Sequence, residues 1–135
     1  MQKNIDIAAL LLRIALGAMF LAHGLLKILV FTVPGTVAFF EQVGFPGWTA
    51  YLVIAGEVGG GVLILAGLAT RATSVALLPV LLGAMYVHFG NGWLFTNANG
   101  GWEYPAFLAV TAGALALLGP GRYAVPIHRW RQTDA

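Results

Sequence analysis

The stretch IAALLLRIALGAMFLAHGLLKILVF, from Ile7 to Phe31, decides the fold, because it is long enough to cross a bilayer yet carries ionisable side chains. As a helix, about 20 apolar residues span the hydrocarbon core of a membrane. Arg13, His23 and Lys27 interrupt this run. A charged side chain at the bilayer centre costs about 3 kcal/mol on insertion scales, so each needs a partner, water or a route to the interface. We therefore expect a charged face that turns toward other helices.

A helical wheel locates that face. At about 100° per residue, a stripe of roughly 80° contains Arg13, Gly17, Phe20, Gly24 and Lys27. His23 lies about 40° beyond Lys27 on the same side. This stripe is predicted to face protein instead of lipid.

The composition indicates a membrane protein with one domain over residues 1–135. The chain is 59% hydrophobic and 9% charged, so a soluble fold would expose large apolar patches. Its net charge is +2, but the basic residues form no stripe that could follow a phosphate backbone, which argues against nucleic acid as a partner. The absence of cysteine excludes dithiol catalysis, thiolate metal ligands and disulfides in this chain.

Breaks in the apolar pattern predict an all-α fold, an antiparallel bundle of four transmembrane helices. The spans are expected at about residues 7–30, 48–68, 72–89 and 103–119, with a short interfacial helix at 37–43. Only residues 69–71 separate the second and third spans, so these two should be antiparallel neighbours.

The basic residues predict the orientation. They gather at the amino end, at the turn between the second and third spans, and at the carboxyl end: Lys3, Arg71, Arg122, Arg129 and Arg131. By the positive-inside rule both termini are cytoplasmic, and the chain is a multi-pass protein of the cytoplasmic (inner) membrane. Trp48, Trp93 and Trp102 then lie at the outer boundary, as expected of an aromatic belt.

One internal similarity raises the question of a duplicated helix pair. LGAMFLAHG at residues 16–24 resembles LGAMYVHFG at residues 82–90, and each is followed by a helix with a glutamate, Glu57 or Glu103, in its outer half or at its outer end. A repeat related by an axis along the membrane normal would explain this. Chance likeness between alanine-rich apolar segments is the alternative.

The depths of the charged residues place most of them in the outer half of the bundle. With a rise of about 1.5 Å per residue, Lys27 lies about 3 Å, His23 about 9 Å and Glu57 about 13 Å below the outer boundary. His88 lies near the same boundary, Trp93 and Glu103 lie at its rim, and Arg13 lies nearer the inner side. Together they predict a polar pocket that opens outward.

Glu57 has two interpretations. It can be a structural partner of Lys27 or Arg13 that fixes helix register, or a carboxylate that takes and gives a proton. Lys27 could instead extend to the outer headgroups, and Arg13 to the inner ones.

His23 and His88 have several interpretations. Each could simply hydrogen-bond a neighbouring helix, or the two could handle protons beside a bound quinone or phenol, because imidazole titrates near neutral pH. Haem ligation by both histidines would be visible as a Soret band. A metal site is not expected, since the ligand spacing is not diagnostic.

The chain resembles the DoxX family of small four-helix membrane proteins along nearly its whole length. The matching motifs are RIALG at 13–17, His23-Gly24 with Lys27, Glu57 with Gly60-Gly61, GLATR at 67–71, His88, Gly92, GGWEYP at 100–105 and GPGRY at 119–123. The resemblance implies links to quinone oxidoreductases, to quinone or catechol detoxification, and to membrane complexes of oxidative stress.

On this basis the leading hypothesis is a quinone-linked oxidoreductase subunit or a quinone- or phenol-binding accessory protein. Its predicted catalytic residues are Glu57, His23 and Lys27, and its predicted substrate-binding residues are Arg13, His88, Trp93 and Glu103. Quinone is the expected cofactor. Two alternatives remain open: a non-catalytic partner that docks a soluble redox enzyme on its basic tail, and a carrier of small anions. A redox subunit and a second copy of the chain are the candidate protein partners, in addition to the lipid bilayer.

Overall fold

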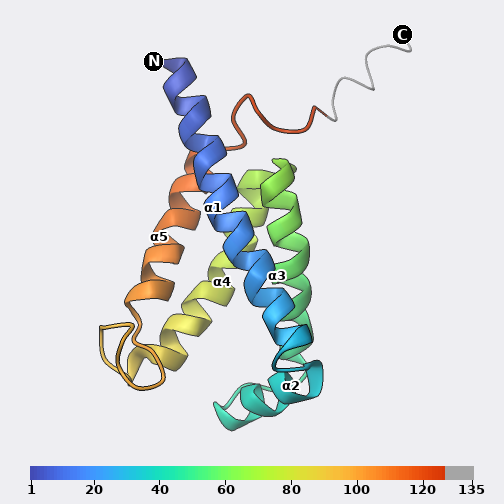
Figure 1. The fold of residues 1–135 in the computed structure, drawn as a ribbon, viewed down its shortest axis with the longest axis vertical. Coiled ribbons are helices and arrows are strands. Elements are labelled where there is room, and N and C mark those ends of the chain that lie inside the picture. Colours follow the sequence, from blue (N-terminus) through green and yellow to red (C-terminus); the bar gives the residue numbers. More distant parts are fainter. Residues whose placement is uncertain (127–135) are drawn as a thin grey trace, which may run out of the picture.

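The protein is an all-α bundle, as predicted. The computed structural model describes residues 1–126, and Figure 1 shows their helices. These are α1 (Gln2–Leu29), α2 (Val33–Gln42), α3 (Thr49–Ala66), α4 (Thr70–Phe89) and α5 (Glu103–Leu118). The long helices agree with the four expected spans to within a few residues, except that α1 begins five residues early, at Gln2.

The short helix α2 also begins earlier than expected. The sequence places it at 37–43, but it starts at Val33, because Pro34 lies in its first turn, where a missing N–H costs nothing. The side chain of Thr32 accepts a hydrogen bond from the Gly35 N–H and caps the new start. Proline here begins a helix instead of ending one.

The bundle consists of two helix pairs. α1 packs along α3, and α4 packs along α5, with α2 lying across the end of the first pair (Figure 1). The two pairs share one apolar core, formed by Leu16, Phe20, Ile64, Leu77, Leu81, Ala112 and Leu115. That core contains residues from all four long helices, so it holds the bundle together as one unit.

Glycines set the distance between α1 and α3. A Cβ on Gly61 would lie 2.7 Å from the Leu21 backbone nitrogen and 2.9 Å from the Gly17 carbonyl oxygen, and one on Gly24 would lie 3.0 Å from the Val58 nitrogen. The two backbones therefore touch, as small residues allow in membrane helices. Gly60, by contrast, leaves room for the Leu77 side chain of α4.

The end of the bundle with both described chain ends is tied together by polar contacts. The backbone N–H of Arg122 donates to the buried carboxylate of Asp6, and the Val125 N–H donates to the Ala66 carbonyl. Arg71 donates to the carbonyls of Ala116, Leu117 and Leu118, which are left free at the end of α5. Asp6, in the early turns of α1, is thus paired with the backbone of Arg122.

Three helices, α1, α3 and α4, are long and apolar enough to cross a membrane, while α5 is apolar but has 16 residues. Large apolar side chains stand exposed on their outer faces, for example Leu117 (82%) and Val110 (74%) on α5. Lipid is the environment that suits such a surface. The four-span count, the cytoplasmic location of the termini and the duplicated helix pair stay predictions.

Candidate functional site

A buried ion pair joins α1 to α3. Lys27 Nζ lies 2.7 Å from Glu57 Oε2, and the two side chains are 18% and 8% exposed. Of the two cations that the sequence offered to Glu57, the structure selects Lys27. The lysine therefore turns toward its partner helix instead of extending to the headgroups.

Helix packing brings these two charges together. Gly24 lies one turn before Lys27, and a Cβ at that position would lie 3.1 Å from the Glu57 Cβ. The missing side chain lets α3 approach α1 at the level of the carboxylate. The lysine stem then needs to cover only a short distance to reach it.

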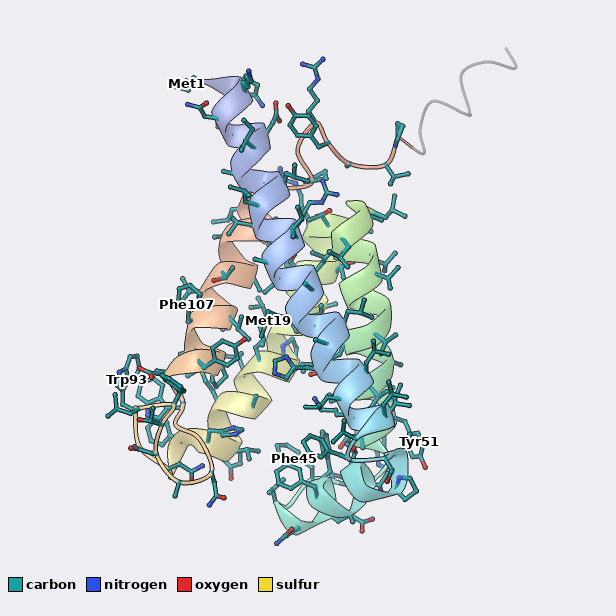
Figure 2. All side chains as sticks on the ribbon, in the orientation of Figure 1. Met1, Met19, Phe45, Tyr51, Trp93 and Phe107 are labelled. Atoms are coloured by element: carbon teal, nitrogen blue, oxygen red, sulfur yellow. The ribbon has the colours of Figure 1, made fainter. Side chains whose placement is uncertain are left out.

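His23 lies one turn before Lys27 on the same face of α1. Its Nδ1 is 2.8 Å from the carbonyl oxygen of Met19, whose place midway along α1 is marked in Figure 2. The half-buried imidazole ring also lies near the ring of Tyr104 on α5, with 6.3 Å between centroids. We call the Lys27–Glu57 pair, His23 one helical turn away and its neighbour Tyr104 together the α1–α3 cluster.

His88 belongs to a second group, at the end of α4. Its Nδ1 lies 2.7 Å from the Ala84 carbonyl oxygen, and a Cβ on Gly100 would lie 3.5 Å from its ring. The ring therefore packs on the loop that joins α4 to α5.

That loop forms a compact cap, which contains two more of the predicted site residues. Glu103 accepts a hydrogen bond from the Phe95 N–H, and its own N–H donates to the Trp93 carbonyl. The Trp93 ring, labelled in Figure 2, meets that of Trp102 edge to face at 4.5 Å. The contacts of Trp93 and Glu103 thus stabilise the loop between α4 and α5.

Arg13 lies apart from both groups. Its guanidinium donates to the carbonyls of Ile64, Leu65 and Pro120 at 2.7 to 3.0 Å, and the residue is 2% exposed. Ile64 is seven residues beyond Glu57, about 10 Å farther along α3. Arg13 thus caps the far end of α3, and a role in binding substrate stays a prediction.

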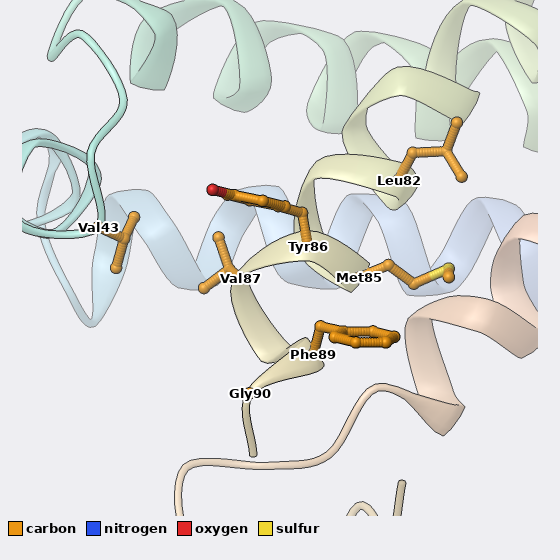
Figure 3. A pocket seen from close by; sticks show the side chains of 7 residues that line it. All are labelled: Val43, Leu82, Met85, Tyr86, Val87, Phe89 and Gly90. Atoms are coloured by element: carbon orange, nitrogen blue, oxygen red, sulfur yellow. The ribbon is translucent and has the colours of Figure 1, made fainter. Parts of the chain in front are cut away.

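Two hollows are visible on the surface, and neither is lined by the predicted site residues. The first, of about 510 Å³, lies between Val43 and the last turns of α4, where Tyr86 is its most polar side chain (Figure 3). The second, of about 450 Å³, is an apolar groove between α3 and α4 lined by Gly56, Gly60 and Leu77 among others. The Lys27–Glu57 ion pair of the α1–α3 cluster lies outside both hollows.

The α1–α3 cluster combines three kinds of group that can bind a small polar ligand. Lys27 supplies a cationic donor, Glu57 an anion that holds it, and His23 a ring nitrogen that can exchange a proton. Sequence reasoning missed Tyr104. Its signal was its place in the first turn of the fourth span, at the depth expected for His88.

These features define a small helical membrane protein with an ion pair inside its bundle. A DoxX family model matches residues 8–90, and the chain belongs to the DoxX family. With the apolar helices, this makes it a multi-pass protein of the inner membrane, in contact with the lipid bilayer.

Two curated proteins are similar along most of the chain. "Putative oxidoreductase CatD" of Bacillus subtilis (strain 168) is 38% identical over 119 residues, which cover 88% of this chain and 84% of that protein. "Inner membrane protein YqjF" of Escherichia coli (strain K12) is 32% identical over 127 residues, which cover 93% and 94%. No solved structure matches the chain significantly.

Proposed function

We propose that this protein binds a quinone or phenol headgroup at the α1–α3 cluster, as a quinone-linked oxidoreductase subunit or a binding accessory. Lys27 holds a ligand oxygen, Glu57 holds Lys27 in place, and His23 exchanges a proton with the ligand. Arg13, His88, Trp93 and Glu103 keep their predicted binding roles only as predictions.

The observation that carries the proposal is the buried pair itself. A Lys–Glu pair inside a bundle is a weak source of stability, because desolvation offsets most of its Coulomb energy. Ionisable residues inside a membrane bundle are rare and typically mark ligand, ion or proton pathways. His23 and Tyr104 beside the pair add titratable and aromatic surface, which a ring-shaped ligand requires.

The similarity to a protein named as an oxidoreductase supports the same class of function. It supports no particular substrate, because chemistry resides in a site and is not transferred by the fold alone. The choice of a quinone or phenol rests on the charged and aromatic residues of the α1–α3 cluster.

The test is equilibrium binding of duroquinone and durohydroquinone to the full-length protein in lipid nanodiscs, with protein-free nanodiscs as the reference. We expect saturable binding that weakens about tenfold or more in Lys27→Met and Glu57→Gln, since each loses a charge-assisted contact. Thr111→Val is the control, because this exposed hydroxyl bonds only to the Phe107 carbonyl on its own helix.

Two results would contradict the proposal: no saturable binding of either compound, or binding that both charge variants leave unchanged. The alternative, docking of a soluble redox enzyme on the basic tail, then gains support from one pattern in cells. Deletion of the residues after Gly121 should abolish resistance to oxidants, while the charge variants should keep it. Uptake of small anions by reconstituted vesicles tests the carrier alternative separately.

A further inference from the structure

The hydrogen bond of His23 fixes which ring nitrogen carries the proton. A carbonyl oxygen can only accept, so Nδ1 must donate to Met19 at 2.8 Å. In the neutral imidazole, Nε2 then carries a lone pair and no hydrogen. Among residues 1–126 no group donates to this nitrogen. His23 therefore keeps an unused acceptor at Nε2.

The same cluster also presents an unused donor. The Lys27 ammonium has three hydrogens, and its only side-chain partner in the described part of the chain is Glu57 Oε2 at 2.7 Å. Lys27 follows His23 by four residues, which places their Cβ atoms about 6 Å apart on one helix face. A residue with a free acceptor and a residue with a free donor thus lie on one face of α1, one helical turn apart.

A ligand oxygen between them must do two things at once. A carbonyl oxygen can accept from Lys27 but has nothing to give to a bare Nε2. A hydroxyl oxygen can accept from Lys27 and donate to His23. A quinone in this position would leave the Nε2 lone pair facing an oxygen lone pair, which costs free energy in a site with little water.

Tyr104 favours a ligand that contains an aromatic ring. Its ring is tilted by 40° from that of His23 at a centroid distance of 6.3 Å. Both rings are at least partly accessible, so an aromatic ring attached to the hydroxyl can pack against them.

From this geometry we propose that the α1–α3 cluster selects the hydroxyl-bearing, reduced form of its ligand, a phenol or hydroquinone, through donation from the ligand O–H to His23 Nε2. The inference rests on the proposed function and narrows it. It concerns recognition alone, and no electron transfer is part of it.

The experiment compares three ligands that share one ring. Durohydroquinone has both hydroxyls, its dimethyl ether has the same oxygens without hydrogens, and duroquinone has carbonyls. Binding to the full-length protein is measured in nanodiscs without oxygen, with protein-free nanodiscs to correct for partition into lipid. We expect the hydroquinone to bind about tenfold or more tightly than either of the others, the equivalent of one hydrogen bond.

Variants at position 23 tie this preference to the imidazole. His23→Phe should reduce the ratio to near one, while His23→Gln, which keeps an acceptor oxygen, should retain part of it. A merely structural role for His23 would change all three affinities together. If His23→Phe does not fold, the test rests on the three wild-type affinities and on His23→Gln, which should keep part of the preference for the hydroquinone.

The outcomes separate the two proposals. If no ligand saturates, the proposed function fails, and this inference fails with it. If the quinone or the ether binds as tightly as the hydroquinone, the proposed function stands and the inference is overturned. A preference that survives in His23→Phe also overturns it.

Discussion

Glu57 and Lys27 show at the scale of single residues why one partner cannot be removed alone. Each is a charge inside a helix pair, and each is held by the other at 2.7 Å. Removing one leaves the other without compensation in a medium of low dielectric constant. The pair is therefore costly to break, although its net contribution to stability is small.

We predict that Lys27→Met and Glu57→Gln each lower the free energy of unfolding by about 3 kcal/mol, at the low end for buried pairs because the lysine is partly accessible. The double variant should regain most of this loss. Unfolding in mixed micelles measures all three. Single variants as stable as the wild type would show that no coupling exists between the two charges.

Arg13 illustrates a different use of a buried cation. Its planar fork donates to three carbonyls, two at the end of α3 and one in the segment that follows α5. An ammonium group has the same charge but cannot reach three acceptors in one plane.

Arg13→Lys is therefore expected to cost about 2 kcal/mol of stability, although the charge is kept. Thermal unfolding in detergent measures the change. Quinone or hydroquinone binding at the α1–α3 cluster should remain unaltered in the folded fraction. A selective loss of binding would instead restore Arg13 to the site.

The partner of Glu57 shows how much of the site the sequence could predict. It offered Glu57 two cations, and the wheel placed Arg13 and Lys27 on one face. Only the level at which α1 crosses α3 decides between them, and a wheel contains no crossing point. Tyr104 was missed for the same reason, because its neighbour lies on a helix 81 positions earlier in the chain.

At the scale of elements, the crossing of α1 and α3 depends on a few glycines. A methyl group on Gly61 would press on the Leu21 backbone, which cannot move aside as a flexible side chain can. Gly59, two residues away on another face of α3, has open space around it.

We expect Gly61→Ala to destabilise the bundle by about 2 kcal/mol through overpacking. Gly59→Ala should be neutral or slightly stabilising, since alanine favours a helix. Comparing the two by unfolding in mixed micelles separates packing from propensity. Equal stability of the two variants would mean that α1 and α3 do not touch as described.

The sequence predicted the helices well, because four apolar runs between Gly, Pro and charged residues leave few other interpretations. It placed Gly17 and Gly24 on the protein-facing stripe of the first span, but it did not predict which glycine of α3 meets them. Gly56 and Gly60 have the expected spacing for a close helix pair, yet they accommodate Leu77 of α4, while Gly17, Gly24 and Gly61 join α1 to α3. Spacing shows that approach is possible, but the partner is chosen by the whole bundle.

At the scale of the molecule, the fold places the two described chain ends at one end and α2 with the 90–102 loop at the other (Figure 1). Arg71 lies at the former end, and the exposed Trp93 lies at the latter. This arrangement agrees with the orientation that the basic residues predict.

Because the chain has no cysteine, single cysteines can test that orientation directly. We expect Ala98→Cys, in the exposed loop, to react with an impermeant maleimide in intact spheroplasts. Lys3→Cys should react only after lysis. The reverse pattern would invert the topology, and labelling of both sites in intact spheroplasts would contradict the three spans expected between them.

The central claim is that a ring-shaped ligand binds between His23, Lys27 and Glu57. The most direct measurement is photo-crosslinking with an azido-derivative of durohydroquinone in nanodiscs, followed by peptide mapping, with unlabelled durohydroquinone as competitor. The account predicts labelling, lost on competition, within residues 20–27 of α1 or at Tyr104 of α5. Labelling confined to the apolar groove between α3 and α4, or labelling that the competitor does not reduce, would contradict it.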